Sequence, residues 1–411
     1  MRFTRGFFII TVSIIIFFTL FSCQEEELML ERQLLFSMPI GKMEDQLFVQ
    51  QFDGVNTLSK TRIFMKDGFF FISNGESSKV MEFSSFGDLI SLYYNEERNP
   101  EPVILGKGRN SEVDVTRAAY GYPLKDPGEI VNTLSGDLLI DDKISEQRQE
   151  YDQEDDVMLD RIILRFNENG EFVSYLGQEG PGGTPFPYIH GLYTNADDEI
   201  TVVTRNPSGW KVFWFTNRGD PLYRIDFTND LIPMEEEAVT LSIENIIPDI
   251  QERRVYIKVD YYTENEASMM SFYKSVMLGY DLDEQTYNLN MDLPRNIVKS
   301  DQPVIFEEKE HEYLNEFAGI ARGPSFFLIS PYEGSVYRLT VVDTDGAVKG
   351  RGLIEFSDQD IFFRNYHVNP DGIFSALVCR DFDAEVVWWR SDRFVEESQN
   401  EYSKFIPNER N

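Results

Sequence analysis

The chain has 411 residues, of which 71 are acidic and 38 are basic, so its formal net charge is −33. This charge argues against a protein that coats nucleic acid, because binding to phosphates requires clustered cations. An apolar fraction of 42% with 14% aromatic residues excludes a mostly disordered chain. Two cysteines, one of them near the N-terminus, exclude a disulfide scaffold and a cysteine-based zinc cluster. Three histidines leave little for metal or base chemistry, and we expect neither a metal nor a cofactor.

Residues 1–22 have the pattern of a secretory signal. Arg2 and Arg5 form a charged start, and the apolar run that follows is shorter than the roughly 20 residues that a membrane-spanning helix needs. The segment ends in Leu20-Phe21-Ser22-Cys23, which resembles a bacterial lipobox. The resemblance implies cleavage before Cys23 and attachment of lipid to that cysteine.

We therefore expect an exported lipoprotein of the bacterial cell envelope, held at a membrane through the lipid on Cys23. The alternative is an uncleaved signal anchor in which Cys23 is unmodified. Residues 23–32, with the run Gln24-Glu25-Glu26-Glu27, are predicted to form a short, solvated acidic tether. The acidity of the body disfavours its direct contact with anionic lipid headgroups.

Residues 33–397 consist of short runs of alternating apolar and polar residues separated by turn signals, and residues 398–411 form a polar tail. The clearest unit runs from Thr61 to Tyr94, where Lys66-Asp67-Gly68, Asn74–Ser78 and Phe86-Gly87-Asp88 separate four strands. Gly and Asp accept the positive φ that tight hairpin turns require. This pattern predicts a four-stranded antiparallel meander.

Similar units follow along the chain and predict a β-propeller. They cover residues 128–177, 189–227, 239–293, 317–356 and 367–394. A lone four-stranded sheet cannot bury both of its faces, whereas sheets stacked radially bury them against each other. The last unit has only three strands, and we expect Gln33–Ile40, or the stretch through Val49, to supply the fourth and close the ring. Six blades are predicted, or seven if the long fourth unit holds two sheets.

Three segments resemble the NHL family of propellers. Leu176–Ile189 is similar to the Gly-rich link that opens an NHL repeat, Asp67–Ile72 to its second strand, and Asp160–Gly170 to its third strand and turn. The whole chain also resembles uncharacterised six-bladed propeller lipoproteins of spirochaetes and related bacteria. The resemblance implies an all-β fold but hardly a function, because propellers serve as binding proteins, lyases, hydrolases and scaffolds.

The long insertions fall in connections that a propeller places on one face, namely the links between blades and the loops between second and third strands. They are residues 95–127, 141–160, 178–187, 261–275 and 294–316. Repeat proteins often bind through the face that carries their insertions. We therefore predict a binding or scaffolding module that receives a protein, peptide or glycan on this face.

Three of these insertions contain candidate binding residues. The first holds cations suited to a carboxylate ligand, but it lacks the Ser or Thr that follows the Lys of a phosphate loop. The acidic second suits a cationic partner or is simply a solvated loop, since it lacks the glycine and spacing of a calcium loop. Aromatic and Met residues in 261–275 are typical of binding hot spots, unless they fold back to cap the propeller. The candidates are Lys107, Arg109, Arg117, Asp152, Asp155, Asp156, Tyr262, Met270 and Tyr273.

We identify no catalytic residue with a recognisable motif. His190 and His367 are expected on or near first strands, which line the central channel, as a base or ligand or as packed structural side chains. One alternative function, a hydrolase or lyase of envelope sugars, requires both histidines within hydrogen-bond reach of carboxylates. Another is a subunit of an envelope-assembly complex. Cys379 is expected to be a buried, inert thiol.

Overall fold

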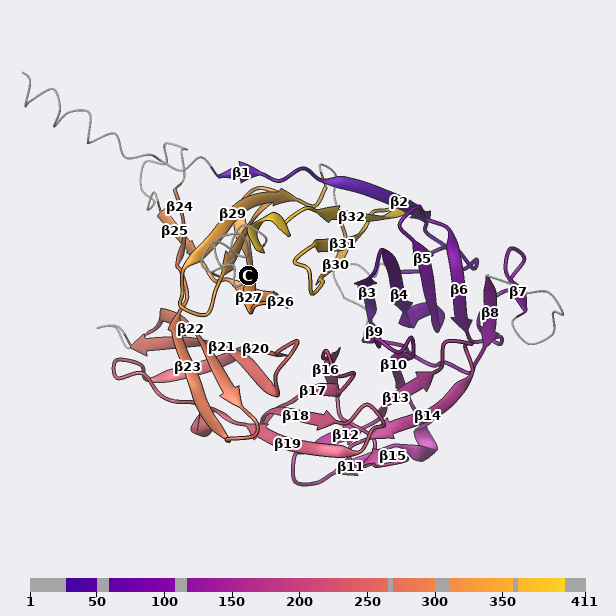
Figure 1. The fold of residues 1–411 in the computed structure, drawn as a ribbon, viewed down its shortest axis with the longest axis horizontal. Helices are drawn as coiled ribbons and strands as arrows, with labels where there is room; N and C mark the ends of the chain where they lie inside the picture. Colours follow the sequence, from indigo (N-terminus) through magenta and orange to yellow (C-terminus); the bar gives the residue numbers. More distant parts are fainter. Residues whose placement is uncertain are drawn as a thin grey trace, which may run out of the picture.

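The computed structural model describes residues 27–49, 59–107, 117–264, 269–299, 310–357 and 361–395. They form a six-bladed β-propeller of four-stranded antiparallel blades around a central axis (Figure 1). The predicted fold class is confirmed. The alternative of seven blades is wrong, because the long fourth unit forms one sheet of four long strands.

The first three blades follow the chain in order. Blade 1 has β3 (Thr61–Lys66), β4 (Phe69–Asn74), β5 (Lys79–Ser84) and β6 (Leu89–Tyr94). Blade 2 has β9 (Ile130–Asn132), β10 (Leu138–Lys143), β13 (Arg161–Phe166) and β14 (Phe172–Gly177). Blade 3 has β16 (Ile189–Thr194), β17 (Ile200–Asn206), β18 (Gly209–Phe215) and β19 (Pro221–Phe227).

The other three blades complete the ring. Blade 4 has β20 (Thr240–Pro248), β21 (Arg254–Glu264), β22 (Met270–Asp281) and β23 (Thr286–Asp292). Blade 5 has β26 (Glu316–Ala321), β27 (Ser325–Glu333), β28 (Val336–Val342) and β29 (Val348–Glu355). Blade 6 has β30 (Phe363–Val368), β31 (Phe374–Cys379), β32 (Asp383–Trp389) and β2 (Gln33–Pro39). Blade 6 therefore begins before residue 367, earlier than the sequence indicated.

Tight turns join the strands where the sequence places Gly and Asp. Between β3 and β4, Asp67 has a φ of 51° and Gly68 a φ of 79°. Two consecutive residues with positive φ form the hairpin turn whose twist matches that of the flanking strands. The register of blade 1 follows, with Lys66 opposite Phe69 and Thr61 opposite Asn74.

An N-terminal strand closes the ring, as predicted. β2 pairs antiparallel with β32, with Gln33 opposite Trp388 and Pro39 opposite Asp383. Phe36 is buried from this strand, and its ring centroid lies 5.1 Å from that of Phe83 in blade 1. The closing strand therefore joins the last blade to the first by backbone hydrogen bonds and by packing.

The core consists of apolar layers between neighbouring blades. Trp214 and Trp389 are fully buried, and the Trp389 ring lies 5.5 Å from that of Phe356, between blades 5 and 6. Trp388 instead donates a hydrogen bond of 2.7 Å from Nε1 to Gln33 Oε1 in the closing strand. Cys379 is a free, buried thiol whose pKa is raised by burial, as expected of an inert side chain. Within the described ranges, no helix is long and apolar enough to cross a membrane.

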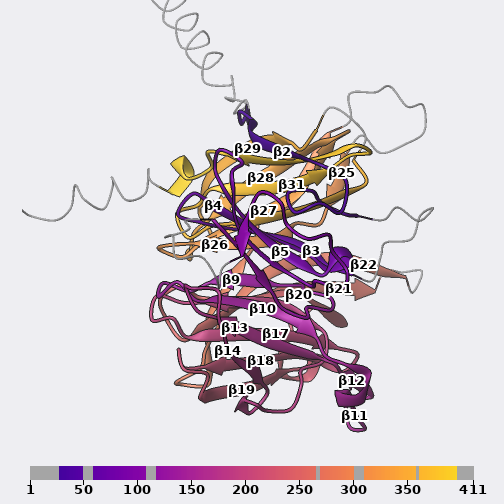
Figure 2. The same ribbon diagram turned by 90° about the vertical axis from the view of Figure 1, so that its right-hand side faces the viewer.

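Further elements lie in links and second-to-third-strand loops, and the larger ones project from one side of the ring (Figure 2). The larger ones are the hairpin β11 (Glu150–Asp152) and β12 (Val157–Leu159), the outer ends of β21 and β22, and the hairpin β24 (Asn296–Lys299) and β25 (Glu310–Tyr313). The shorter ones are β7 (Gly106–Lys107), β8 (Ala118–Gly121), β15 (Gly180–Pro181), η1 (Gly75–Ser77), η2 (Glu146–Arg148) and η3 (Asn229–Leu231). We call the side with the three larger elements the insertion face and the other side, with the tight turns, the turn face.

Candidate functional site

A cavity of about 620 Å³ follows the axis of the propeller. The first strands of all six blades line it, which are β3, β9, β16, β20, β26 and β30. Arg62 and Tyr188 lie toward the insertion face, and Asp67 and Asp371 lie in the turns at the other end. The volume lies within the range of about 300–1,000 Å³ that is usual for small-molecule sites.

Several charged groups on the cavity wall are paired with one another. Arg62 donates a hydrogen bond of 2.8 Å from Nε to Glu129 Oε1. Burial opposes ionisation of Glu129, but Arg62 and Lys60 outweigh it and hold the pKa of this carboxyl below its ordinary value. Arg322 forms an ion pair with Asp371 near the turn face. These pairs offset much of the charge that a ligand in the cavity would meet.

His190 lines the cavity from β16. Its ring lies edge-on to Trp210, with centroids 4.7 Å apart. Burial lowers the pKa of His190 to about 4, although the charge of Glu129 acts in the opposite direction. The imidazole is therefore neutral at neutral pH and packs against an aromatic side chain.

His367 lines the cavity from β30 and joins the last blade to the first. Its Nδ1 accepts a hydrogen bond of 3.3 Å from the Met65 amide, and its ring lies 4.7 Å from that of Phe64. Burial lowers the pKa of His367 to about 4. In the part of the chain that the structure describes, neither histidine hydrogen-bonds a carboxylate. The arrangement that the hydrolase or lyase alternative requires is therefore not formed by these two residues.

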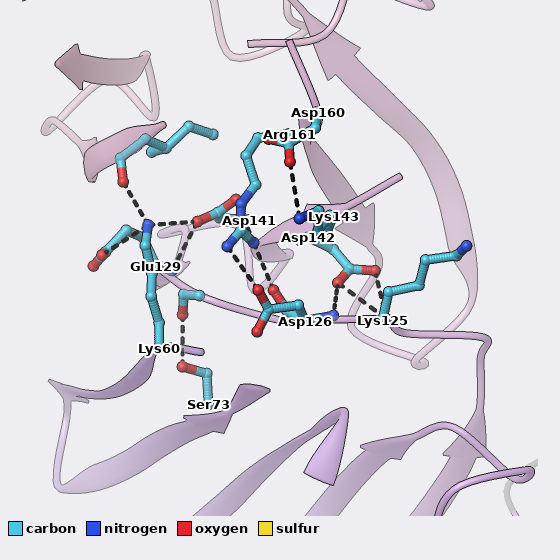
Figure 3. Close-up of polar contacts among 12 residues, drawn as sticks. Lys60, Ser73, Lys125, Asp126, Glu129, Asp141, Asp142, Lys143, Asp160 and Arg161 are labelled. Carbon is cyan, nitrogen blue, oxygen red and sulfur yellow. Dashed lines mark hydrogen bonds and ion pairs between the residues drawn. The ribbon is translucent and has the colours of Figure 1, made fainter. Parts of the chain in front are cut away.

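A buried ionic network joins the first three blades at the insertion-face end of the cavity (Figure 3). Lys60 is 3% exposed, and its Nζ lies 2.9 Å from Asp141 Oδ2 and 3.3 Å from Glu129 Oε1. The same ammonium donates to the carbonyl oxygen of Ile189. Arg161 donates a 2.9 Å hydrogen bond to Asp126 Oδ2. Sequence reasoning missed this network because its members come from distant segments with no common spacing.

The acidic insertion 141–160 is a folded hairpin rather than the solvated loop that was the simpler expectation. Asp155 forms an ion pair with Lys211 of blade 3 and accepts a 3.1 Å hydrogen bond from Ser208 Oγ. Asp152 accepts the amide of Glu154 at 2.9 Å, and Asp156 accepts the hydroxyl of Tyr151. The carboxylates thus have separate partners. Among the described residues, no group of three or more His, Cys, Asp or Glu side chains is arranged to hold a metal ion.

The same hairpin exposes two apolar side chains that sequence reasoning missed. Tyr151 and Met158 face each other across β11 and β12 and are 54% and 46% exposed. Because the ion pair of Asp155 with Lys211 fixes the hairpin to blade 3, it presents this pair in a defined position. Exposed aromatic and Met side chains on a fixed element are typical of binding surfaces.

The predicted cationic spot is not gathered on the insertion face. β8 runs parallel to β6 with Ala118 opposite Ser91, so Arg117 lies toward the turn face. There its guanidinium lies 3.0 Å from Asp88, in the turn between β5 and β6. Lys107 ends β7 beside β8, and Arg109 lies outside the described residues. Asn95 follows the insertion-face end of β6, whereas Arg117 lies near the opposite end of this strand, and no pattern in the sequence indicates this separation.

The aromatic and Met candidates of residues 261–275 lie partly at exposed and partly at packed positions. Met270 is exposed near the outer end of β22, opposite Glu264. The ring of Tyr262 lies 6.2 Å from that of Phe272, and both side chains are partly buried. Tyr273 packs against the apolar layer between blades 3 and 4. Both expectations for this insertion therefore hold in part, with Met270 outward and Tyr273 folded back.

Further apolar side chains on the insertion face lie in links between blades. The carboxylate of Glu44 accepts the amides of Val103 at 3.1 Å and Ile104 at 2.7 Å, which fixes this part of the first link. Exposed apolar side chains in links and hairpins of this face are Met43, Val103, Ile104, Tyr151, Met158, Tyr188, Leu231, Met234, Val239, Met269, Met270, Ile297, Tyr313, Leu314 and Phe382. The fold and site thus define a propeller with an axial cavity and a face of apolar projections.

Comparison with known proteins finds solved structures of low similarity. No protein-family model and no curated protein matches the chain. A member of the DUF4221 family from Bacteroides vulgatus has a TM-score of 0.42 at 10% identity, covering 89% of this chain and 98% of the other. An ulvan lyase of polysaccharide lyase family PL25 has a TM-score of 0.41 at 10% identity, with coverage of 87% and 83%. The α-l-arabinofuranosidase arb93a from Fusarium graminearum has a TM-score of 0.40 at 10% identity, with coverage of 86% and 96%. Likenesses of this size bear on neither the ligand nor the activity of this chain.

Proposed function

We propose that this chain is an exported lipoprotein of the bacterial envelope whose propeller binds a protein, peptide or glycan through the insertion face. The lipid on Cys23 holds it at a membrane, as the lipobox-like Leu20-Phe21-Ser22-Cys23 implies. In this proposal the chain is a distant NHL-like propeller. The ring acts as a rigid support that presents its projections with little ordering cost on binding.

The observation that carries the proposal is the position of the apolar projections. The hairpin β11–β12 arises from blade 2, the ends of β21–β22 from blade 4 and the hairpin β24–β25 from the link between blades 4 and 5, and all three project on one side (Figure 2). Exposed apolar side chains also occur on the turn face, where Phe86 and Leu134 lie in tight turns, but on the insertion face they stand on projecting elements, which supports a partner on this face. The histidines of the cavity are occupied in packing, which favours binding over catalysis.

The test compares a variant of the insertion face with one of the turn face. Tyr151→Ser combined with Met158→Ser removes the apolar pair of the β11–β12 hairpin without touching the ion pair of Asp155. Phe86→Ser is the matched control, because Phe86 is 86% exposed and lies in the turn between β5 and β6, on the turn face.

Each variant is expressed in the native cell, crosslinked and isolated with its partners. We expect a reproducible partner that the double variant loses and Phe86→Ser retains. Loss in both variants, or retention in both, contradicts binding through this hairpin. Absence of any partner contradicts the proposed function. Co-isolation of several integral membrane proteins in one complex is the result that the alternative of an envelope-assembly subunit predicts.

A further inference from the structure

The chain is attached to blade 5 almost directly after Cys23. The carboxylate of Glu27 lies 2.8 Å from Arg338 Nε in β28. β1 (Leu28–Met29) adds to the outer edge of blade 5, pairing parallel with β29. Leu30 is buried, and its amide donates a 2.8 Å hydrogen bond to Leu353. The solvated tether expected for residues 23–32 is therefore attached to the ring from Glu27 onward.

This attachment limits the distance between the ring and a lipid on Cys23. The four peptide units from Cys23 to Glu27 span at most about 15 Å when fully extended. Because β1 pairs with Gly352 and Leu353, near the middle of β29, the tether leaves from the outer edge of blade 5 rather than from either face. A lipid on Cys23 thus holds that edge close to the bilayer.

The same edge exposes apolar side chains from two adjoining segments. Arg338 connects them, because it contacts both Glu27 and Asn296 of β24. β1 and the β24–β25 hairpin lie at the same corner of the ring in Figure 1. We call this surface the blade-5 rim and define it by the exposed residues Leu28, Met29, Ile297, Tyr313 and Leu314.

Charges of both signs lie in this region, in contrast to the strongly acidic chain as a whole. Glu27 pairs with Arg338, and Arg295 pairs with Glu312 on the β24–β25 hairpin. Apolar and aromatic side chains without a net charge suit the interface of a bilayer of zwitterionic lipid. Anionic headgroups would be repelled by the chain, whose net charge is −33.

We propose that the blade-5 rim, which includes the β24–β25 hairpin, rests on a zwitterionic lipid surface. The ring then stands edge-on, and the rest of the insertion face, with β11–β12 and the outer ends of β21–β22, opens sideways above the membrane. The proposal rests on the proposed lipid anchor at Cys23. Its consequence is that a partner approaches along the membrane plane, which suits a second membrane-anchored molecule.

The experiment supplies the anchor chemically, so that it does not depend on acylation in the cell. The mature chain from Cys23, with the buried Cys379→Ala, is coupled through Cys23 to a maleimide lipid in phosphatidylcholine vesicles. A fluorescent non-natural amino acid is placed at Leu314 on the rim, at Phe86 in blade 1, or at Met158 on the β11–β12 hairpin. Quenching by spin-labelled lipid measures which position lies at the bilayer.

We expect at least threefold stronger quenching at position 314 than at positions 86 and 158. Equal quenching at all three positions, or none at 314, overturns the proposal.

Leu28→Ser combined with Ile297→Ser keeps the tether length and is expected to reduce quenching at position 314 at least twofold. Unchanged quenching in this double variant refutes contact through the rim. A dimer of the unanchored chain through this rim, seen by sedimentation, also refutes it. Mass spectrometry of Cys23 from native cells tests the natural anchor separately.

Discussion

The register of the closing strand β2 on β32 can be tested with two substitutions. Phe36 and Leu34 both lie in β2, but Phe36 is 8% exposed and Leu34 is 52% exposed. The Phe36 ring packs between blades 6 and 1, with centroids 5.1 Å from Phe83 and 6.0 Å from Phe70. Truncation of a buried Phe removes its transfer free energy and leaves a cavity. Phe36→Ala should therefore lower the free energy of unfolding by about 3–5 kcal/mol.

Leu34→Ala is the matched control, and it should change the free energy of unfolding by about 0.5 kcal/mol or less. Urea denaturation followed by tryptophan fluorescence measures both values, and Trp388, hydrogen-bonded to Gln33, reports on the closing strand itself. The midpoint should fall for Phe36→Ala with little change in the slope. Equal effects of the two substitutions, or a larger effect of Leu34→Ala, would refute the register of β2 on β32.

Three further predictions concern the buried charges, the cavity and the tether. Asp141→Ala leaves Lys60 without its nearest carboxylate and should lower the free energy of unfolding by about 3 kcal/mol in urea titrations; a change near zero contradicts a buried network. His367 has its pKa lowered from 6.5 to about 4, so its contribution is complete above pH 6.5 and is lost as the pH falls toward 4. The melting temperature of wild type should fall as the pH drops through that window, and His367→Asn should reduce this fall, whereas substitution of the exposed His311 by Asn should leave it unchanged. Parallel curves of melting temperature against pH for wild type and His367→Asn would be inconsistent with burial of His367. Leu30→Ala should speed amide exchange of residues 28–30 at least tenfold with the ring still folded, and unchanged exchange would show that Leu30 does not hold the tether.

The propeller could be predicted because each blade is specified locally. In blade 1 the turn residues Asp67-Gly68 and Gly87 delimit strands whose bounds the sequence indicated to within a residue. The missing fourth strand of the last unit predicted closure by β2, because an unpaired sheet edge requires a partner. The start of blade 6 at Phe363 was missed because that strand alternates little and is half-buried throughout most of its length.

The candidate site was predictable in position but not in detail. The topology of a propeller assigns each insertion to a face, and this required only the order of strands. Contacts between distant segments gave no such signal: Lys60 meets Asp141 across 81 positions, and Arg117 reaches Asp88 only because β8 runs beside β6. The hairpin in 141–160 was obscured by its charge, although Tyr151 and Met158 flank its acidic turn and mark its two strands.

Binding through the insertion face is tested most directly by a photo-crosslinking map in living cells. A photoreactive amino acid is placed at Ile104, Met158 and Met270 on the insertion face, and at Phe86 and Leu134 on the turn face. We predict that all three positions of the first group form crosslinks to the same partner and that neither position of the second group does. Crosslinks from both faces at equal yield, or from the turn face alone, would contradict the proposed function.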